Sequence, residues 1–396
     1  MKVHAGEQPA LDQIAFPYAY YSAEDIAQRT VYVEASRGCP FKCEFCLSAL
    51  DKTAWPFPLD DLLRELDALH TRGARVFKFV DRTFNLNINN SLRILQFFLD
   101  KLDEYPDDPV FAHFELVPDH LPEALRETIS RFPPGALQFE IGIQSFNPEV
   151  QARISRKQNN EKAMANLRWL REATHAHLHV DLIAGLPGED IESFARGFDQ
   201  LVALQPHEIQ FGILKRLRGT PIIRHTQAYG LVFDPAPPYQ ILATDCIAFN
   251  TMQRLVRFAR YWDLVANSGR FSERLPDILG NAPFARFLAL SDWLYANTDA
   301  THRISPDRLG RLLEAWLETR STDAADNRED RTRETTSDDT VLAASEKNRA
   351  SATRRQQRHQ AALPSAVARQ ASISERASSL SEDKGRVRAR SKIISA

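Results

Sequence analysis

A chain of 396 residues with 43% apolar side chains can bury one large core and still carry a further segment. Its formal net charge of −2 creates no overall field that would attract nucleic acid or an anionic membrane. The first residues lack the basic and then apolar profile of a signal peptide, and no run of about 18 apolar residues predicts a membrane span. We therefore expect a cytoplasmic protein without a membrane partner, in a compartment where thiols stay reduced.

Short β-branched or aromatic runs alternate with longer amphipathic runs from Val31 onward. The predicted strands cover residues 31–36, 75–81, 110–116, 137–142, 178–184 and 208–214. The predicted helices lie between them, over residues 59–72, 89–102, 122–131, 161–173 and 191–204. This alternation predicts an α/β fold with a parallel sheet and helices outside it. Six units indicate a partial (β/α)6 TIM-like barrel, with an open doubly wound sheet as the competing architecture.

The segments on either side of this pattern differ in composition. Residues 1–30 are polar with scattered aromatic side chains, and we expect an N-terminal lead-in that packs on the first strand of a core over residues 31–220. Residues 221–319 are rich in Leu, Phe and Trp and predict a helical C-terminal extension. Residues 320–396 contain no Phe, Trp or Tyr and cannot bury enough apolar surface to offset their ordering entropy. We predict a disordered tail there, and its short basic runs are more typical of a solvated tail than of a nucleic-acid site.

Three of the four cysteines, Cys39, Cys43 and Cys46, lie within eight residues directly after the first predicted strand. The C-x3-C-x2-C spacing lets each thiolate bind one iron of a cubane cluster and leaves the fourth iron without a protein ligand. Most ferredoxins use four cysteines per cluster, so an open iron indicates chemistry on a bound ligand. Zinc is an alternative, although it requires a fourth ligand and the next histidine, His70, lies on a predicted helix. A fortuitous grouping of cysteines is the other alternative.

Polar residues collect near the predicted carboxyl ends of the strands, where α/β barrels place their reacting groups. Glu115 ends the third strand, His179 and Asp181 alternate on the fifth, and Lys215 follows the sixth. Carboxylates inside apolar runs are costly unless they are paired or bind a ligand. We expect these four residues to contact a substrate as catalytic candidates. For His179, a satisfied core histidine is the more common alternative.

The cysteine motif has an aromatic residue before its last cysteine (Cys39-x3-Cys43-x-Phe45-Cys46) and resembles the signature of the radical S-adenosylmethionine (SAM) superfamily. Residues 79–85 (FVDRTFN), 139–145 (FEIGIQS) and 181–189 (DLIAGLPGE) look like later motifs of that family, in the expected order. The resemblance covers about residues 30–220. It points to the branch whose members often carry a cobalamin-binding domain, and the segment after residue 220 looks like the C-terminal extension of one uncharacterised group in that branch.

The resemblance implies a [4Fe–4S] cluster on the three cysteines, whose open iron chelates the amino and carboxylate groups of SAM. The implied SAM contacts are Phe45, Ile183 and Gly185 at the adenine, Asp81 or Thr83 at the ammonium, Glu140, Gln144 and Ser145 near the ribose or sulfonium, and Arg156 at the carboxylate. An electron from the reduced cluster then splits the S–C5′ bond and yields a 5′-deoxyadenosyl radical. The implied partners are an external electron donor and a small-molecule or peptide substrate, with methyl transfer as one outcome.

The sequence departs from that branch ahead of the cysteine motif. Members usually place the cobalamin domain there, but 38 residues precede Cys39, fewer than the roughly 100 of a typical domain. We expect cobalamin from a separate subunit, or chemistry without cobalamin, or a truncated and inactive relative. The remaining alternative, from another class, is a non-catalytic binding protein stabilised by zinc or by a cluster.

Overall fold

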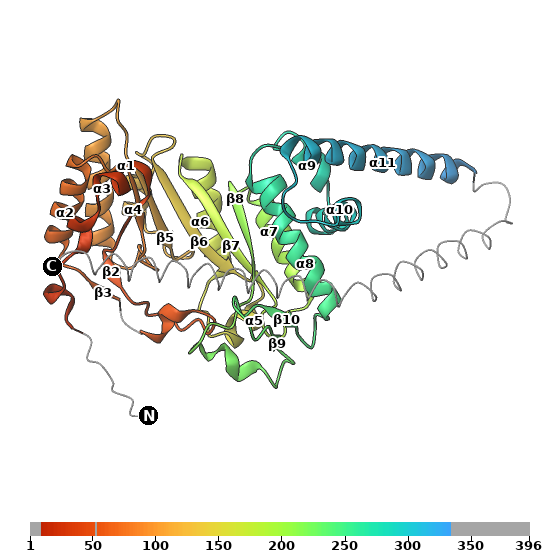
Figure 1. The fold of residues 1–396 in the computed structure, drawn as a ribbon, viewed down its shortest axis with the longest axis horizontal. Coiled ribbons are helices and arrows are strands. Elements are labelled where there is room, and N and C mark those ends of the chain that lie inside the picture. The colour runs from red at the N-terminus through yellow and green to blue at the C-terminus, as the bar shows by residue number, and fades with distance from the viewer. Residues whose placement is uncertain (1–8, 52–53, 334–396) are drawn as a thin grey trace, which may run out of the picture. The chain divides into compact units, whose positions relative to one another are not determined.

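A six-stranded parallel sheet forms the centre of the computed structural model, which describes residues 9–51 and 54–333 (Figure 1). Its strands are β1 (Val31–Val33), β4 (Val76–Phe79), β5 (Phe111–Leu116), β6 (Leu137–Gln144), β7 (His177–Ala184) and β8 (Glu208–Ile213). They lie in the order β1-β4-β5-β6-β7-β8, and all neighbours run parallel. The six predicted strands are confirmed. Because this order never reverses, the sheet lacks the switch point of a doubly wound fold and progresses as a partial β/α barrel does.

Amphipathic helices connect the strands of this sheet. They are α2 (Leu59–Thr71), α3 (Ile88–Glu104), α4 (Glu123–Ile129), α6 (Asn160–Ala173) and α7 (Ile191–Ala203). The predicted helices are therefore confirmed, with ends that differ by about two residues at most. Two shorter helices, α1 (Ala23–Gln28) and α5 (Pro148–Arg153), were missed because six residues give no clear periodicity.

Side chains satisfy backbone groups at both edges of the sheet. At β1, the Tyr21 hydroxyl accepts a hydrogen bond from the Tyr32 backbone N–H at 3.1 Å and donates to the Tyr32 carbonyl at 2.9 Å. At β8, the Asn267 amide accepts from the Ile209 N–H at 3.1 Å and donates to the Ile209 carbonyl at 3.0 Å. The lead-in thus packs on the first strand, as predicted. Such capping protects the open edges of an unclosed barrel from pairing with other strands.

The segment after residue 220 is mainly helical, as predicted. It contains α8 (Phe249–Trp262), a π-helical turn (Asp263–Asn267), α9 (Leu275–Leu279) and α10 (Pro283–Thr298). Aromatic rings hold α8 and α10 against α7 and β8, with Phe258 next to Phe198, Phe211 and Phe284. Sequence reasoning missed the antiparallel pair β9 (Val232–Phe233) and β10 (Ile241–Ala243), because strands this short leave no alternating pattern.

The remaining described elements are small or lie near the end of the chain. The short strands β2 (Ser36–Arg37) and β3 (Trp55–Pro56) pair around the cysteine loop. The helix α11 (Pro306–Arg333) continues past residue 320, so the first part of the predicted tail is helical, and residues 334–396 lie outside the described residues. A helix once nucleated by buried residues such as Trp316 propagates at little cost. By its internal contacts the chain divides into two units, with the boundary in the sequence between Thr319 and Arg320. None of the described helices is both long and apolar enough to cross a membrane.

Candidate cluster and cofactor site

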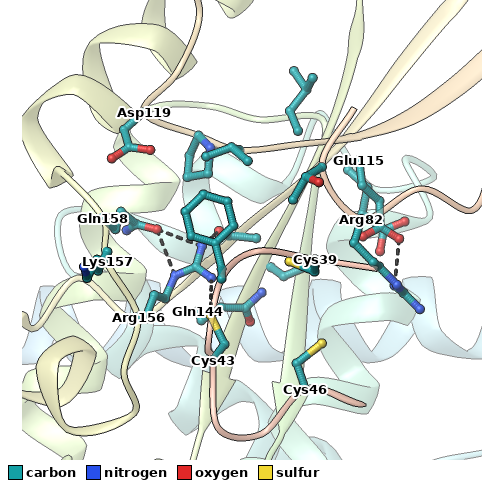
Figure 2. Close-up of a pocket in the computed structure, with 18 of the residues that line it drawn as sticks. Cys39, Cys43, Cys46, Arg82, Glu115, Asp119, Gln144, Arg156, Lys157 and Gln158 are labelled. Atoms are coloured by element: carbon teal, nitrogen blue, oxygen red, sulfur yellow. Dashed lines mark hydrogen bonds and ion pairs between the residues drawn. The ribbon is translucent and has the colours of Figure 1, made fainter. Parts of the chain in front are cut away.

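The three clustered cysteines lie on one wall of a cavity at the carboxyl ends of the central strands (Figure 2). Cys39 and Cys43 are buried, Cys46 is half-buried, and all three are free thiols. The facing wall comes from the ends of β4 to β7 and the loops that follow them. Its polar members are Arg82, Thr83, Glu115, Asp119, Glu140, Gln144, Arg156, Lys157, Gln158 and Asp181. Phe45 lines the same cavity, so the cysteine loop faces the strand ends where a barrel places its reacting groups.

The donor set of this loop fits a cluster better than a single ion. Among the described residues, no three His, Cys, Asp or Glu side chains converge closely enough to share one metal ion. A cubane cluster spreads its thiolate ligands over separate irons, whereas zinc gathers four ligands about one point. Burial raises the pKa of the Cys39 and Cys43 thiols, so they keep their protons until a metal binds.

Arg156 lies between the cysteine loop and the strand ends. Its guanidinium donates to the Gly142 carbonyl and, at 3.0 Å and 2.8 Å, to Gln158 Oε1. Its Nη1 lies 3.5 Å from Cys43 Sγ. Because an arginine is always charged, this side chain places a permanent positive charge beside the sulfurs. A guanidinium in that position is suited to a ligand carboxylate.

Three buried polar atoms of the cavity residues have no hydrogen-bond partner among the described residues. Within that part of the chain Thr83 Oγ1 and Gln144 Oε1 have no partner of any kind, whereas Asp181 Oδ1 lacks a hydrogen bond but lies 3.5 Å from His179 Nε2, so the first two atoms carry the argument. Buried polar groups are normally paired, so unpaired atoms around one cavity indicate a bound ligand. Gln144 also has a φ of 68°, a conformation that residues with side chains rarely adopt and that clusters at functional sites.

Two of the cavity carboxyls hold their protons more tightly than usual. Burial raises the pKa of Glu115 to about 7, although its ion pair with Arg82 at 2.8 Å acts in the opposite direction. Burial also raises the pKa of Asp181 to about 8, and the nearby Glu140 and Glu115 add to the shift. Near neutral pH the Asp181 carboxyl can therefore donate a hydrogen bond as well as accept one.

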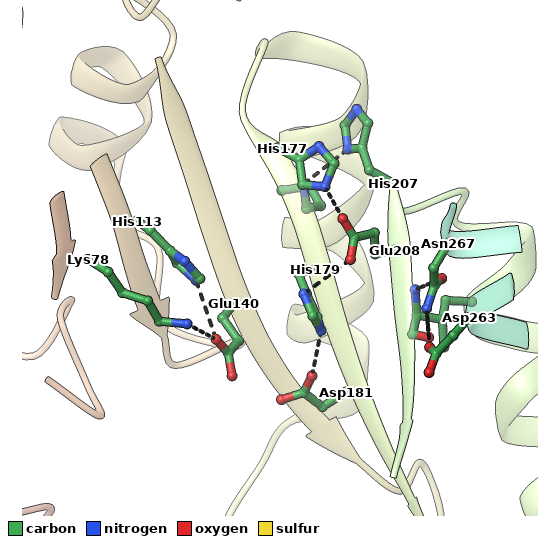
Figure 3. A network of polar contacts seen from close by, with 12 residues as sticks. Lys78, His113, Glu140, His177, His179, Asp181, His207, Glu208, Asp263 and Asn267 are labelled. Carbon is green, nitrogen blue, oxygen red and sulfur yellow. Dashed lines mark hydrogen bonds and ion pairs between the residues drawn. The ribbon is translucent and has the colours of Figure 1, made fainter. Parts of the chain in front are cut away.

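Glu140 has the opposite character and belongs to a row of polar residues across the sheet (Figure 3). His113 Nε2 and Lys78 Nζ each lie 3.3 Å from its carboxylate, and together they lower its pKa to about 2, with His113 the larger influence. On β7, His179 Nε2 lies 3.5 Å from Asp181 Oδ1. A closed β/α barrel fills its interior with branched apolar side chains. In this partial barrel, ionisable side chains continue inward from the cavity.

Asp81 and Ser145, which the resemblance assigns to SAM, are directed elsewhere. The Asp81 carboxylate accepts from the Ala35 N–H at 2.8 Å and from the Ser36 hydroxyl at 2.6 Å, so it fixes the chain that leads to the cysteines. Burial raises the pKa of Asp81 to about 6. Ser145 donates to Glu189 at 2.6 Å. Neither side chain is among the residues that line the cysteine cavity.

Four further sequence candidates also lie outside the lining of this cavity: Ile183, Gly185, His179 and Lys215. Lys215 is exposed and its backbone bridges to Gln240. Sequence reasoning assigned no role to four polar lining residues, Arg82, Asp119, Lys157 and Gln158. Arg82 and Lys157 are adjacent to chosen positions, and Gln158 lies two residues after Arg156. Strand-end position identifies an edge of the sheet, but it does not specify which of two neighbouring side chains turns toward the cavity.

Gly185 begins the loop after β7 with a φ of 86°, and an added Cβ would lie 2.7 Å from Ile241 Cγ2. We expect Gly185→Ala to lower the free energy of unfolding by about 2–4 kcal/mol, since backbone strain and overpacking add together. Denaturant unfolding measures this loss. Gly135→Ala is the matched control, because Gly135 has a φ of 80° with no atom within 4 Å of the added Cβ. An equal loss of stability in the two glycine variants would contradict the steric explanation. So would an undiminished loss when Gly185→Ala is made in an Ile241→Ala background.

Asp181 makes stability depend on pH. Its pKa is about 8 in the fold against a usual 3.8, so between these values the folded chain keeps a proton that the unfolded chain has released. Stability therefore falls as pH rises through this window. We expect the melting temperature of the cluster-free protein to fall less between pH 5 and 8 in Asp181→Asn than in the wild type. Parallel curves for the two proteins would show that Asp181 titrates normally.

Comparison with known proteins gives two family matches. The radical SAM superfamily matches residues 33–201, and a family described as a protein of unknown function (DUF4080) matches residues 227–389. Oxygen-independent coproporphyrinogen III oxidase of Pseudomonas aeruginosa is 35% identical over 75 residues, which are 19% of this chain and 16% of that protein. The tRNA-2-methylthio-N(6)-dimethylallyladenosine synthase of Dichelobacter nodosus is 23% identical over 73% of this chain and 65% of its own length. The chain thus covers less than two thirds of either relative.

Solved structures also align with part of this chain. Coproporphyrinogen III oxidase (HemN) from Escherichia coli, a radical SAM enzyme, is 20% identical over 60% of this chain and 54% of its own, with a TM-score of 0.41. The radical SAM methyltransferase TsrM from Kitasatospora setae, solved with cobalamin and a [4Fe–4S] cluster, is 19% identical over 53% of this chain and 43% of its own, with a TM-score of 0.46.

Proposed function

We propose that this chain, whose residues 33–201 match the radical SAM superfamily, is an enzyme that cleaves S-adenosylmethionine reductively. When bound, a reduced [4Fe–4S] cluster supplies the electron that breaks the S–C5′ bond and leaves a 5′-deoxyadenosyl radical to act on the substrate. The observation that carries the proposal is the meeting of Cys39, Cys43 and Cys46 with unpaired polar atoms around one cavity. The protein's share of such chemistry is to position the reactants and to exclude water.

We assign the SAM contacts from the side chains that line the cavity. Arg156 would bind the carboxylate, because it is the charged fork beside the cysteines. Thr83 is the better of the two candidates for the ammonium, since the oxygens of Asp81 already accept from the chain before the cysteine loop. Gln144 and Glu140 would bind the ribose region, and Phe45 would flank the adenine. Ser145, Ile183 and Gly185 would support these contacts without lining the cavity.

Glu115 and Asp181 are our candidates for direct contact with substrate or with SAM, because both line the cavity in partly protonated form. His179 would act behind Asp181, at 3.5 Å, and Lys215 would contact only a substrate that extends past the cavity. The matched relatives include an oxidase and a synthase, so they do not select one reaction among methyl transfer, rearrangement and oxidation. An external electron donor is required, and cobalamin from a separate subunit fits a methyl transfer.

Metal and sulfide analysis with electron paramagnetic resonance (EPR) tests this proposal. After anaerobic reconstitution we expect iron and sulfide in equal amounts, about four of each per chain. The reduced cluster should give a signal that shifts when SAM is added, because SAM would bind the open iron. Zinc without sulfide would support the binding-protein alternative. A fully loaded cluster whose EPR signal does not change when SAM is added would contradict the proposal.

A further inference from the structure

Glu44 is a buried carboxylate inside the cysteine loop, next to Cys43, with 2% of its surface exposed. Its Oε1 accepts from the Ser155 hydroxyl at 2.6 Å and from the Arg224 guanidinium, and its Oε2 lies 2.8 Å from His225 Nε2. A buried carboxylate is costly unless paired, and here three partners pair it. These partners come from two segments that are distant in sequence, the α5–α6 connection and the 3-10 helix at Pro221–His225.

The backbone of Glu44 is joined to the same two segments. Its N–H donates to the Ile154 carbonyl at 3.0 Å, and its carbonyl accepts from the Ile222 N–H at 3.0 Å. Two residues further along, the Cys46 N–H donates to the Cys43 carbonyl at 3.1 Å and closes a turn that contains Glu44. Any displacement of Pro221–His225 is therefore transmitted directly to the chain between Cys43 and Cys46.

The chain that follows Pro221–His225 packs on the neighbouring loop after β7. The Tyr229 ring lies 4.7 Å from the Arg153 guanidinium, and Arg153 in turn donates to the Pro187 carbonyl at 2.8 Å. Ile241 fills the space beside Gly185. The cysteine loop and the loop after β7, both at the carboxyl end of the sheet, are thus held by one stretch of the C-terminal segment.

We propose that Pro221–His225 is a clamp that sets the position of the cysteine loop, with Glu44 as its attachment point and as a positioning residue for the cluster ligands. The C-terminal segment is then an integral part of the cluster site rather than an appended domain. The inference rests on the proposed function, because the clamp acts by fixing the spacing of the cluster's cysteines. A buried charge network of this kind adds little stability over apolar packing, but it holds one geometry.

Hydrogen exchange followed by mass spectrometry tests the clamp in the full chain before any cluster is added. The variants are Glu44→Gln, which keeps the side-chain shape, and Arg224→Ala and His225→Ala, which change only the partner side. Arg224 is 60% exposed, so its removal leaves the core intact. We expect exchange of the peptide spanning residues 39–50 to accelerate by about tenfold to a hundredfold, the effect of losing a charge-assisted hydrogen bond.

Asp292→Asn is the matched control, because Asp292 pairs with Arg254 at 2.6 Å between α8 and α10, away from the cysteine loop. In this control variant the peptide spanning residues 39–50 should exchange at the wild-type rate. Wild-type exchange in all three clamp variants would overturn the proposal, and so would equal acceleration in the control, which would indicate general destabilisation.

A second measurement uses the cluster itself. In the reconstituted proteins we expect a chelator to remove iron from Glu44→Gln and Arg224→Ala about tenfold faster than from the wild type, and the EPR signal of the reduced cluster to broaden. Wild-type chelation rates and spectra in these variants would overturn the clamp. If the wild type loads no cluster, the proposed function fails, while the exchange experiment still decides whether the clamp exists.

Discussion

Cys43→Ala is expected to leave the protein folded and unable to retain an iron–sulfur cluster. Cys43 is as deeply buried as Cys39 and lies 3.5 Å from the charged Arg156, so its thiolate would be shielded from water and would lie beside a permanent positive charge. Two remaining cysteines would leave two irons of a cubane without protein ligands. Iron and sulfide should fall from about four each per chain to near zero. The measurement is colorimetric iron and sulfide analysis after anaerobic reconstitution.

Cys246→Ala is the matched control for that loss. Cys246 is exposed and does not line the cysteine cavity, so its removal should leave the iron and sulfide content unchanged. Circular dichroism of both variants should match the wild type, which separates loss of a ligand from loss of the fold. A stable, complete cluster in Cys43→Ala would contradict the ligand assignment.

Arg156→Ala is expected to weaken SAM binding to the cluster-loaded protein by about a hundredfold. A charge-assisted hydrogen bond to a carboxylate contributes about 1.5–3 kcal/mol, and the loss of one such bond at the upper end of this range lowers affinity by about a hundredfold. The variant also loses the hydrogen bond to the Gly142 carbonyl and the contact with Gln158. Titration of the EPR signal with SAM gives the dissociation constant.

Arg156→Lys separates the charge of this residue from its geometry. A lysine keeps one positive charge but has no planar fork, so SAM affinity should lie between those of the wild type and Arg156→Ala. Unchanged affinity in Arg156→Ala would remove this residue from the SAM site. Equal, complete loss in both variants would show that the paired geometry, and not the charge, is decisive.

The sheet was predictable because its signals are local. The runs around Val31, Phe114 and Leu178 are apolar and short, and helices of regular leucine spacing separate them. The cysteine loop was predictable for the same reason, since three ligands within eight residues need no long-range contact to be seen. The alternation of strands and helices predicted a parallel sheet, but it left the strand order open between a partial barrel and a doubly wound sheet.

The parts that were missed depend on contacts between distant residues. Asp81 stands at a strand end like Thr83, but only the fold shows that its oxygens face Ala35 and Ser36. Glu44 looks like a spacer between cysteines, because its partner His225 is 181 positions away. Side-chain direction and long-range pairing are set by packing, which no local pattern encodes.

The most direct test of the central claim is anaerobic incubation of the reconstituted wild type with dithionite and SAM, followed by mass spectrometry of 5′-deoxyadenosine, with Cys43→Ala beside it. We predict 5′-deoxyadenosine from the wild type at well above the level from the variant. Equal amounts from the two proteins, or none from a wild type that carries a complete cluster and binds SAM, would contradict reductive SAM cleavage at this site.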